Sequence, residues 1–157
     1  GVQTCALPIS MARFGLVACL VLATLAFQGG RAAAQQAQRI ALVIGNSTYT
    51  EAPLKNPVND ARAMSAALRS RGFQVITREN ATKSQMESAV ADFGEKLTEG
   101  ATGLFFFAGH GMQVQGRNFL VPVDAKITSE QRVRLETLDV DMVLDQMQGA
   151  QIGRAHV

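Results

Sequence analysis

The sequence predicts an α/β protein in which a mostly parallel central sheet lies between two layers of helices. Three short apolar runs, at residues 39–46, 73–77 and 103–109, are rich in branched or aromatic side chains, as buried strands are. The two intervals between these runs carry apolar residues at helical spacing. Strands that alternate with helices form parallel sheets covered on both faces, so we expect a three-layer α/β/α architecture.

The first strand and the first helix are expected between Arg39 and Gly72. The run RIALVIGN, residues 39–46, is apolar until Gly45 and Asn46 close it. In the next interval Asn56 is expected to cap a helix with Pro57 at its first position, and Gly72 is expected to end it. One face of this helix would carry Val58, Ala61, Met64 and Leu68.

The second strand and the second helix follow in the same way. FQVIT, residues 73–77, is predicted to be a strand. Thr82 and Gln85 have the spacing of a capping box, which predicts a helix start, and Gly100 is the expected end. The buried face of this helix would carry Met86, Val90, Phe93 and Leu97.

The third apolar run, GLFFFAG at residues 103–109, is predicted to be the most buried strand of the sheet. Its three phenylalanines, 105–107, are interpreted as core residues rather than as a platform for stacking bases. Residues 112–124 then alternate around Gly116 as a hairpin does, and Pro122 would confine the second arm to a sheet edge. Residues 135–147 are predicted to form a third helix.

The two ends of the chain resemble segments that do not belong to a folded domain. Residues 1–10 and 152–157 resemble translated sequencing adapters, and residues 11–34 have the basic start, apolar run and small-residue end of a signal peptide. The apolar run is shorter than the ~20 residues that span a bilayer. We therefore expect an exported domain over residues 35–151, periplasmic or secreted, with no membrane association after cleavage.

Charge and cysteine content exclude several classes of function for residues 35–151. This segment has 12 basic and 13 acidic side chains, a net charge of −1, which gives no basic footprint for nucleic acid. Both cysteines, Cys5 and Cys19, lie before it, so no disulfide is expected within it. The segment also lacks a G-x-G-x-x-G loop, and we expect no nucleotide cofactor.

His110 is the candidate functional residue, because it stands between two glycines at the exit of the third predicted strand. Ligands and chemistry collect past the carboxyl ends of strands in open parallel sheets. An imidazole there can transfer protons near neutral pH, and the Gly111 amide can donate to a developing oxyanion. A second interpretation is that the glycines form a tight turn and His110 is a turn residue. Position alone leaves both interpretations open.

Five motifs in order carry a family resemblance. They are RIALVIGN, LKNPVNDA, RGFQVI, FFFAGHG and GRNFLVPVDA, and together they resemble the caspase-like cysteine peptidases, above all the bacterial caspase and metacaspase homologues. The resemblance runs from about Arg39 to Met147. It implies a caspase-like fold, with His110 as the histidine of a Cys-His dyad and the Gly111 amide as half of an oxyanion hole. The substrate would be a peptide or a protein.

The resemblance also implies that the nucleophile lies outside this sequence. In caspases the histidine precedes the catalytic cysteine by about 50 residues, which corresponds to about residue 160 here. We therefore expect residues 35–151 to be the N-terminal part of a catalytic domain, inactive alone and active in the full-length protein. The alternative is a catalytically inactive caspase-like interaction module of the cell envelope. With about half of the family's strands present, the last strand would expose an unpaired apolar edge, which predicts low solubility.

Specificity and cofactors are also inferred from the resemblance. Caspases that cut after aspartate carry a primary-pocket arginine where this chain has Leu54, so cleavage after lysine or arginine is favoured. Asp60 suits either a helix start or an acidic pocket. Calcium activates some metacaspases, but Asp139, Asp141 and Asp145 lack the pattern of a calcium loop, and we expect no cofactor.

Overall fold

The computed structural model describes residues 38–149. The predicted adapter segments, the predicted signal peptide and both cysteines lie outside these residues. Among the helices of residues 38–149, none has the length and apolar character needed to cross a membrane.

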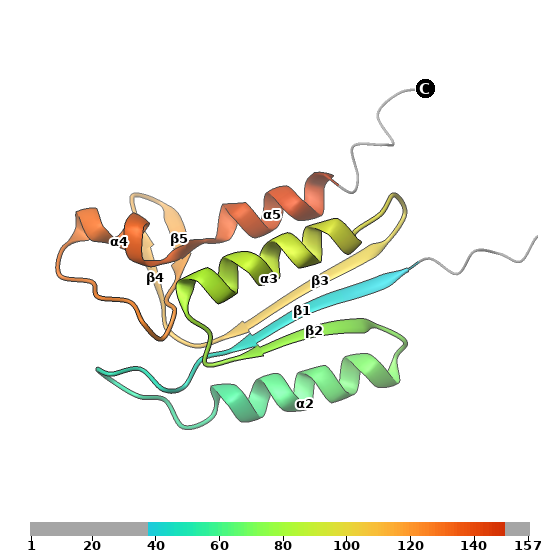
Figure 1. Ribbon diagram of the computed structural model, residues 1–157, viewed down its shortest axis with the longest axis horizontal. Helices are drawn as coiled ribbons and strands as arrows, with labels where there is room; N and C mark the ends of the chain where they lie inside the picture. The colour runs from blue at the N-terminus through green and yellow to red at the C-terminus, as the bar shows by residue number, and fades with distance from the viewer. Residues whose placement is uncertain (1–37, 150–157) are drawn as a thin grey trace, which may run out of the picture. The chain divides into compact units, whose positions relative to one another are not determined.

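Three parallel strands form the central sheet. They are β1 (Arg39–Gly45), β2 (Gln74–Glu79) and β3 (Thr102–Ala108), in the order β2-β1-β3. β1 pairs in parallel with β2 on one side and with β3 on the other, so the first predicted strand is the central one (Figure 1). The predicted α/β class and the parallel sheet are confirmed.

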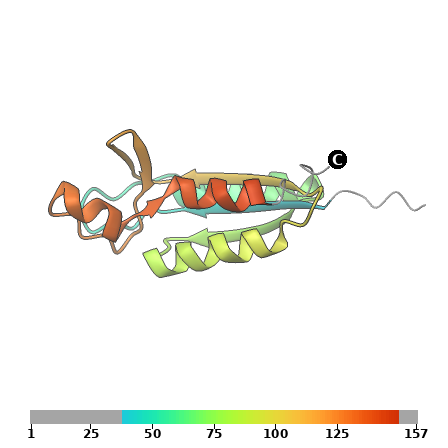
Figure 2. The ribbon, with the colours of Figure 1, turned by 90° about the horizontal axis from the view of Figure 1, so that it is seen from above.

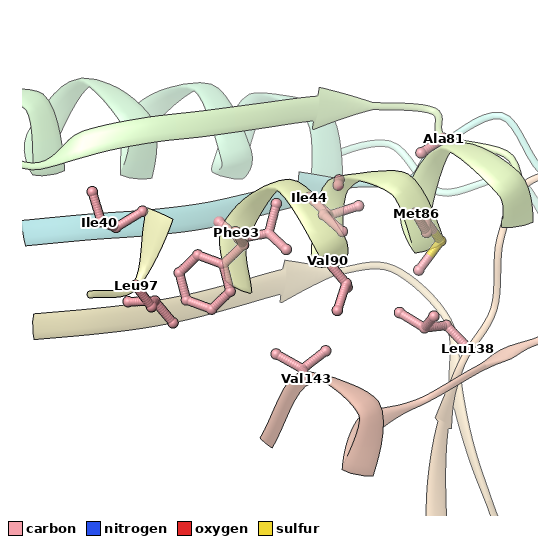
Figure 3. Packing of buried hydrophobic residues seen from close by; sticks show 11 residues of the cluster. Ile40, Ile44, Ala81, Met86, Val90, Phe93, Leu97, Leu138 and Val143 are labelled. Carbon is pink, nitrogen blue, oxygen red and sulfur yellow. The ribbon is translucent and has the colours of Figure 1, made fainter. Parts of the chain in front are cut away.

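Helices cover both faces of this sheet because the side chains of β1 alternate between them. Ile40, Leu42 and Ile44 pack with α3 (Lys83–Lys96) and α5 (Val140–Gly149). Figure 3 shows this cluster, in which Phe93 of α3 and Val143 of α5 come together. Ala41 and Val43 face α2 (Pro57–Ser70) on the other side. The two clusters fill the spaces between the sheet and its two helix layers, so the three predicted layers are present.

The prediction that the third strand is the most buried one is wrong. All residues of β1 after Arg39 are buried, whereas β3 is mostly half-buried. The reason is its position, because β3 has a strand partner on only one side within residues 38–149. Its aromatic residues still pack against the two clusters, Phe105 and Phe107 on one face and Phe106 on the other, which confirms their core role.

The helix ends differ in how well the sequence predicted them. Thr82 and Gln85 form the expected capping box of α3, with both reciprocal bonds present. α2 begins as predicted, with Asn56 at the N-cap position and Pro57 at the first helical position, but the Asn56 side chain makes no capping bond. The backbone of Asn56 is already helical, while a capping residue is usually extended. α3 ends at Lys96 rather than near Gly100, because the Leu97 backbone leaves the helix while its side chain stays in the core.

Thr82→Ala should lower the free energy of unfolding by about 1 kcal/mol, because the Gln85 amide loses its acceptor. Ser129→Ala is a matched control, since Ser129 precedes α4 (Glu130–Glu136) but makes no side-chain capping bond. Urea unfolding followed by circular dichroism compares the two variants. Equal losses in both would mean that the Thr82 capping box contributes nothing to stability.

A second, antiparallel sheet has the order β4-β5-β6. β4 (Gly111–Val114) and β5 (Arg117–Leu120) form the predicted hairpin around a two-residue turn, in which Gln115 and Gly116 both have positive φ. β5 also pairs with β6 (Leu138–Asp139) and is therefore central, not an edge strand as predicted from Pro122. The proline lies beyond the end of β5 and removes no ladder bond.

The third predicted helix, residues 135–147, is interrupted. α4 ends at Glu136, Thr137 is extended, and Leu138–Asp139 pairs with β5 before α5 begins. Leu138 is fully buried in the cluster beside α3, so pairing and burial at this point outweigh the helical pattern. The break turns α5 onto the same face of the sheet as α3.

The segments outside the parallel sheet and its covering helices lie together at one end of that sheet. Figures 1 and 2 show the β1–α2 loop, the β4–β5 hairpin and α4 beyond the arrowheads of the parallel strands. This end is the one at which parallel α/β proteins bind ligands.

Candidate active site around His110

His110 lies two residues after β3, at the start of the hairpin, and is half-buried. Its Nε2 is 2.8 Å from the carbonyl oxygen of Ala52 in the β1–α2 loop. A carbonyl can only accept a hydrogen bond, so we assign the proton to Nε2. In the neutral imidazole this leaves Nδ1 as the basic nitrogen.

Tyr49 holds His110 from a second side. Its hydroxyl accepts a hydrogen bond from the His110 amide, at 3.0 Å, and donates one to the carbonyl of Val121, also at 3.0 Å. The two rings lie at a centroid distance of 4.5 Å and a tilt of 54°. Burial raises the pKa of the Tyr49 phenol above 10.0, while its bond to the His110 amide acts in the opposite direction. The phenol is therefore protonated at neutral pH.

The two glycines beside His110 have different roles. A Cβ atom on Gly109 would lie 2.5 Å from the Tyr49 hydroxyl, so a side chain there would displace the phenol. A Cβ atom on Gly111 would meet only the Phe119 carbonyl at 3.5 Å, an ordinary contact. Gly109 is required by local packing, whereas the space around Gly111 is open.

The Gly111 amide points away from its strand partner. The Val121 amide donates to the His110 carbonyl, at 2.9 Å, which marks His110 and Val121 as a hydrogen-bonded position of the ladder, although the His110 amide donates to Tyr49 instead of to Val121. Hydrogen-bonded pairs alternate along an antiparallel ladder, which puts Gly111, opposite Leu120, at a non-bonded position. β4 is also the outer strand of its sheet. The exposed Gly111 therefore directs its N–H outward, as a donor to an oxyanion must.

The loop that supplies the Ala52 carbonyl is hydrogen-bonded to the segment that follows β2. Asn80, after β2, accepts hydrogen bonds through Oδ1 from the amides of Ser47, at 2.8 Å, and Thr48, at 3.1 Å. Ala52 itself has a φ of 54°, a conformation that costs a non-glycine residue about 1 kcal/mol. The structure holds this strained residue where its carbonyl meets His110.

Asn46, which directly follows β1, is fully buried behind the site. Its Oδ1 accepts from the Ala81 amide at 2.8 Å, and its Nδ2 lies 3.4 Å from the Ala81 carbonyl and 3.3 Å from the Val121 carbonyl. The Val121 carbonyl therefore accepts from both Asn46 and Tyr49. These bonds join the end of β1, the start of α3 and the chain after β5.

Sequence reasoning placed His110 and Gly111 at this edge but missed Tyr49, Asn46 and the Ala52 carbonyl. Asn46 did leave a signal, because a polar amide that directly follows a fully apolar strand needs buried partners. A backbone carbonyl leaves no comparable signal.

Asp60 and Leu54, the residues considered for the substrate pocket, belong to the first turn of α2 and to the loop before it. Asp60 lies in the first turn of α2, as a helix-start role requires, but it is exposed, and Leu54 is half-buried.

Two of the aspartates considered for calcium are paired with an arginine. Asp139 and Asp141 both form ion pairs with Arg117, the second at 3.4 Å. Within residues 38–149, no group of three or more His, Cys, Asp or Glu side chains is arranged to hold a metal ion.

Comparison with known proteins gives the family. Residues 38–151 match the caspase domain family. The chain is also 41% identical over 88 residues to mucosa-associated lymphoid tissue lymphoma translocation protein 1 of Homo sapiens, and equally to its homolog in Mus musculus. The aligned part is 55% of this chain and 11% of each relative. Because the matched region includes the whole described fold and the His110 site, the chain belongs to the caspase domain family.

Proposed function

We propose that the full-length protein is a cysteine-type endopeptidase of the caspase and metacaspase kind, in which His110 is the general acid and base. Family membership supports a protease function. The observation that carries the assignment to His110 is its bond to the Ala52 carbonyl, which orients the ring and leaves Nδ1 as the proton-accepting atom. Residues 35–151 contain no cysteine, so the nucleophile would come from a later part of the protein.

The proposed reaction follows from these groups. Nδ1 accepts the thiol proton of the cysteine, and the thiolate adds to the carbonyl carbon of the peptide bond. The oxygen of the tetrahedral intermediate becomes an anion, and the Gly111 N–H donates to it. The imidazolium then protonates the leaving amine as the C–N bond breaks. Water, deprotonated by the same imidazole, hydrolyses the thioester and restores the thiol.

The Ala52 carbonyl has a defined part in this reaction. An imidazolium carries a positive charge, and a carbonyl oxygen 2.8 Å from Nε2 lies at the negative end of its own dipole. The charge that His110 gains when it takes the thiol proton is therefore stabilised at the second nitrogen. This is the role that a carboxylate has in other catalytic triads.

The test is to sequence the gene beyond Gln151 and to assay the full-length product on short peptides ending in arginine, lysine or aspartate. We expect a cysteine about 50 residues after His110, and cleavage that its replacement by alanine abolishes. A complete reading frame without a cysteine in that region would overturn the proposal. It would favour the alternative, a catalytically inactive interaction module.

We further propose cleavage after lysine or arginine. Leu54, at the position of the primary-pocket arginine of aspartate-specific caspases, offers no positive charge to an acidic side chain. Asp60 is exposed one turn into α2, directly after the loop that carries the Ala52 carbonyl, and forms no ion pair within residues 38–149. It is thus the candidate acidic group for a basic side chain.

Asp60→Asn should lower kcat/KM for peptides ending in arginine by about 10-fold or more, since a hydrogen bond to a charged group is lost. Asp145→Asn, which changes an exposed aspartate of α5, is the matched control and should leave this rate unchanged. A rate after Asp60→Asn equal to that of the control would exclude Asp60 from the pocket.

We also propose that the protein is exported, on the signal-peptide pattern of residues 11–34. Cell fractionation with an antibody to the domain tests this. Recovery of the protein with its leader uncleaved in the cytoplasm would contradict it.

A further inference from the structure

We propose that Tyr49 is a positioning residue for His110, which fixes both the backbone and the ring of the histidine in the arrangement that leaves Nδ1 free. The proposal deepens the proposed peptidase function and rests on it for its kinetic test. Its spectroscopic test, which measures the tautomer of His110, depends only on the geometry and not on the proposed function.

Three contacts converge on His110 from this one side chain and its loop. The Tyr49 hydroxyl accepts the His110 amide at 3.0 Å, and its ring lies against the imidazole at a centroid distance of 4.5 Å. Three residues further along the same loop, the Ala52 carbonyl accepts from Nε2 at 2.8 Å. Backbone, ring face and ring edge of the histidine are each held by the β1–α2 loop.

The tyrosine is itself fixed. It is 7% exposed, and its hydroxyl donates to the Val121 carbonyl at 3.0 Å. Gly109 is the residue that makes room for this hydroxyl, because a Cβ atom there would lie 2.5 Å from it. The phenol thus joins the β1–α2 loop to both arms of the chain around the hairpin.

The hydroxyl is not a candidate proton donor to substrate. Its single proton goes to the Val121 carbonyl, and the lone pair that accepts the His110 amide is also occupied. Acting through His110 is therefore the part that its contacts support.

Tyr49→Phe keeps the aromatic ring and removes the hydroxyl. We expect kcat to fall by about 10-fold with KM changed by less than about twofold, because the loss acts on the orientation of the reacting group. We also expect ring ¹⁵N NMR of His110 to show the Nε2–H tautomer in the wild-type protein and a mixture of tautomers in the variant. Both measurements use the full-length protein.

Ser65→Ala is the matched control. Ser65 is 1% exposed, and its hydroxyl bonds the Thr77 hydroxyl at 2.9 Å between α2 and β2, with no contact to His110. It removes a buried hydroxyl bond of the same kind and should change neither kcat nor the tautomer of His110. If Tyr49→Phe matches Ser65→Ala in both measurements, Tyr49 is a structural residue only, and the proposal is wrong.

Gly109→Ala is a second variant, whose Cβ would lie 2.5 Å from the Tyr49 hydroxyl and 2.7 Å from the Phe107 ring, so it displaces the phenol without removing its hydroxyl but also presses on Phe107. We expect the same change in the His110 tautomer, and an unchanged ¹⁵N spectrum would overturn the proposal. A wild-type protein with no peptidase activity, but with the expected tautomer change in both variants, would reject the proposed function and retain the role of Tyr49.

Discussion

Replacing His110 by alanine in the full-length protein should lower kcat/KM for peptide cleavage by about 10³-fold, within the range that general acid–base groups contribute. The variant loses the group that accepts the thiol proton and protonates the leaving amine. Its fold should be retained, since His110 is only half-buried and its amide keeps the bond to Tyr49. Single-turnover assays on a short peptide, together with a thermal melt, measure the two effects separately.

Gln113→Ala is the control for His110→Ala, because Gln113 is exposed three residues along the same hairpin and bonds only the Asn118 side chain among the described residues. It should keep the wild-type rate. Full activity in the His110 variant would show that this histidine has no part in catalysis. Loss of activity with a collapsed melting transition would instead assign a structural role to the side chain.

Asn46→Ala should produce the largest loss of stability, about 3 kcal/mol in the free energy of unfolding. The Ala81 amide, the Ala81 carbonyl and the Val121 carbonyl all lose a buried partner. The Ala81 amide is left without a partner, which costs about 1–3 kcal/mol, whereas the Ala81 carbonyl still accepts from the Val123 amide and the Val121 carbonyl from Tyr49, which limits the total. Urea unfolding followed by circular dichroism gives the change.

Asn118→Ala is the matched control, since it removes the same amide from an exposed position of β5. It should alter stability by less than about 0.5 kcal/mol, as surface substitutions usually do. A loss for Asn46→Ala no larger than for Asn118→Ala would contradict the view that the buried amide joins the segments behind the site.

The order of strands and helices up to the β4–β5 hairpin could be predicted because its signals are local. An apolar run, a capping box and a turn glycine each act within a few residues, as in β1, in the Thr82 box and at Gly116. The interruption at Thr137 could not be predicted, because β6 is two residues long and exists by pairing with β5. The greater burial of β1 likewise depends on its having neighbours on both sides.

The residues of the site also differ in whether a local signal marks them in the sequence. His110 could be placed because the carboxyl ends of parallel strands meet at one edge. The acceptor of its Nε2 proton could not, because any residue can supply a carbonyl and because the positive φ of Ala52 is not a preference of alanine. Tyr49 is 61 residues before His110, and no pattern in the sequence links the two.

The two hydrogen bonds that the Val121 carbonyl accepts can form only late in synthesis on the ribosome. Its two donors, Asn46 and Tyr49, precede Val121 by 75 and 72 residues. At about 5–20 residues per second, synthesis takes roughly 4–15 s to pass from Asn46 to Val121. During that interval the nascent chain already contains β1 and Tyr49, but the carbonyl that receives the phenol proton does not yet exist. His110 itself precedes Val121 by only 11 residues, so its surroundings are completed shortly after it is made, once the hairpin has emerged.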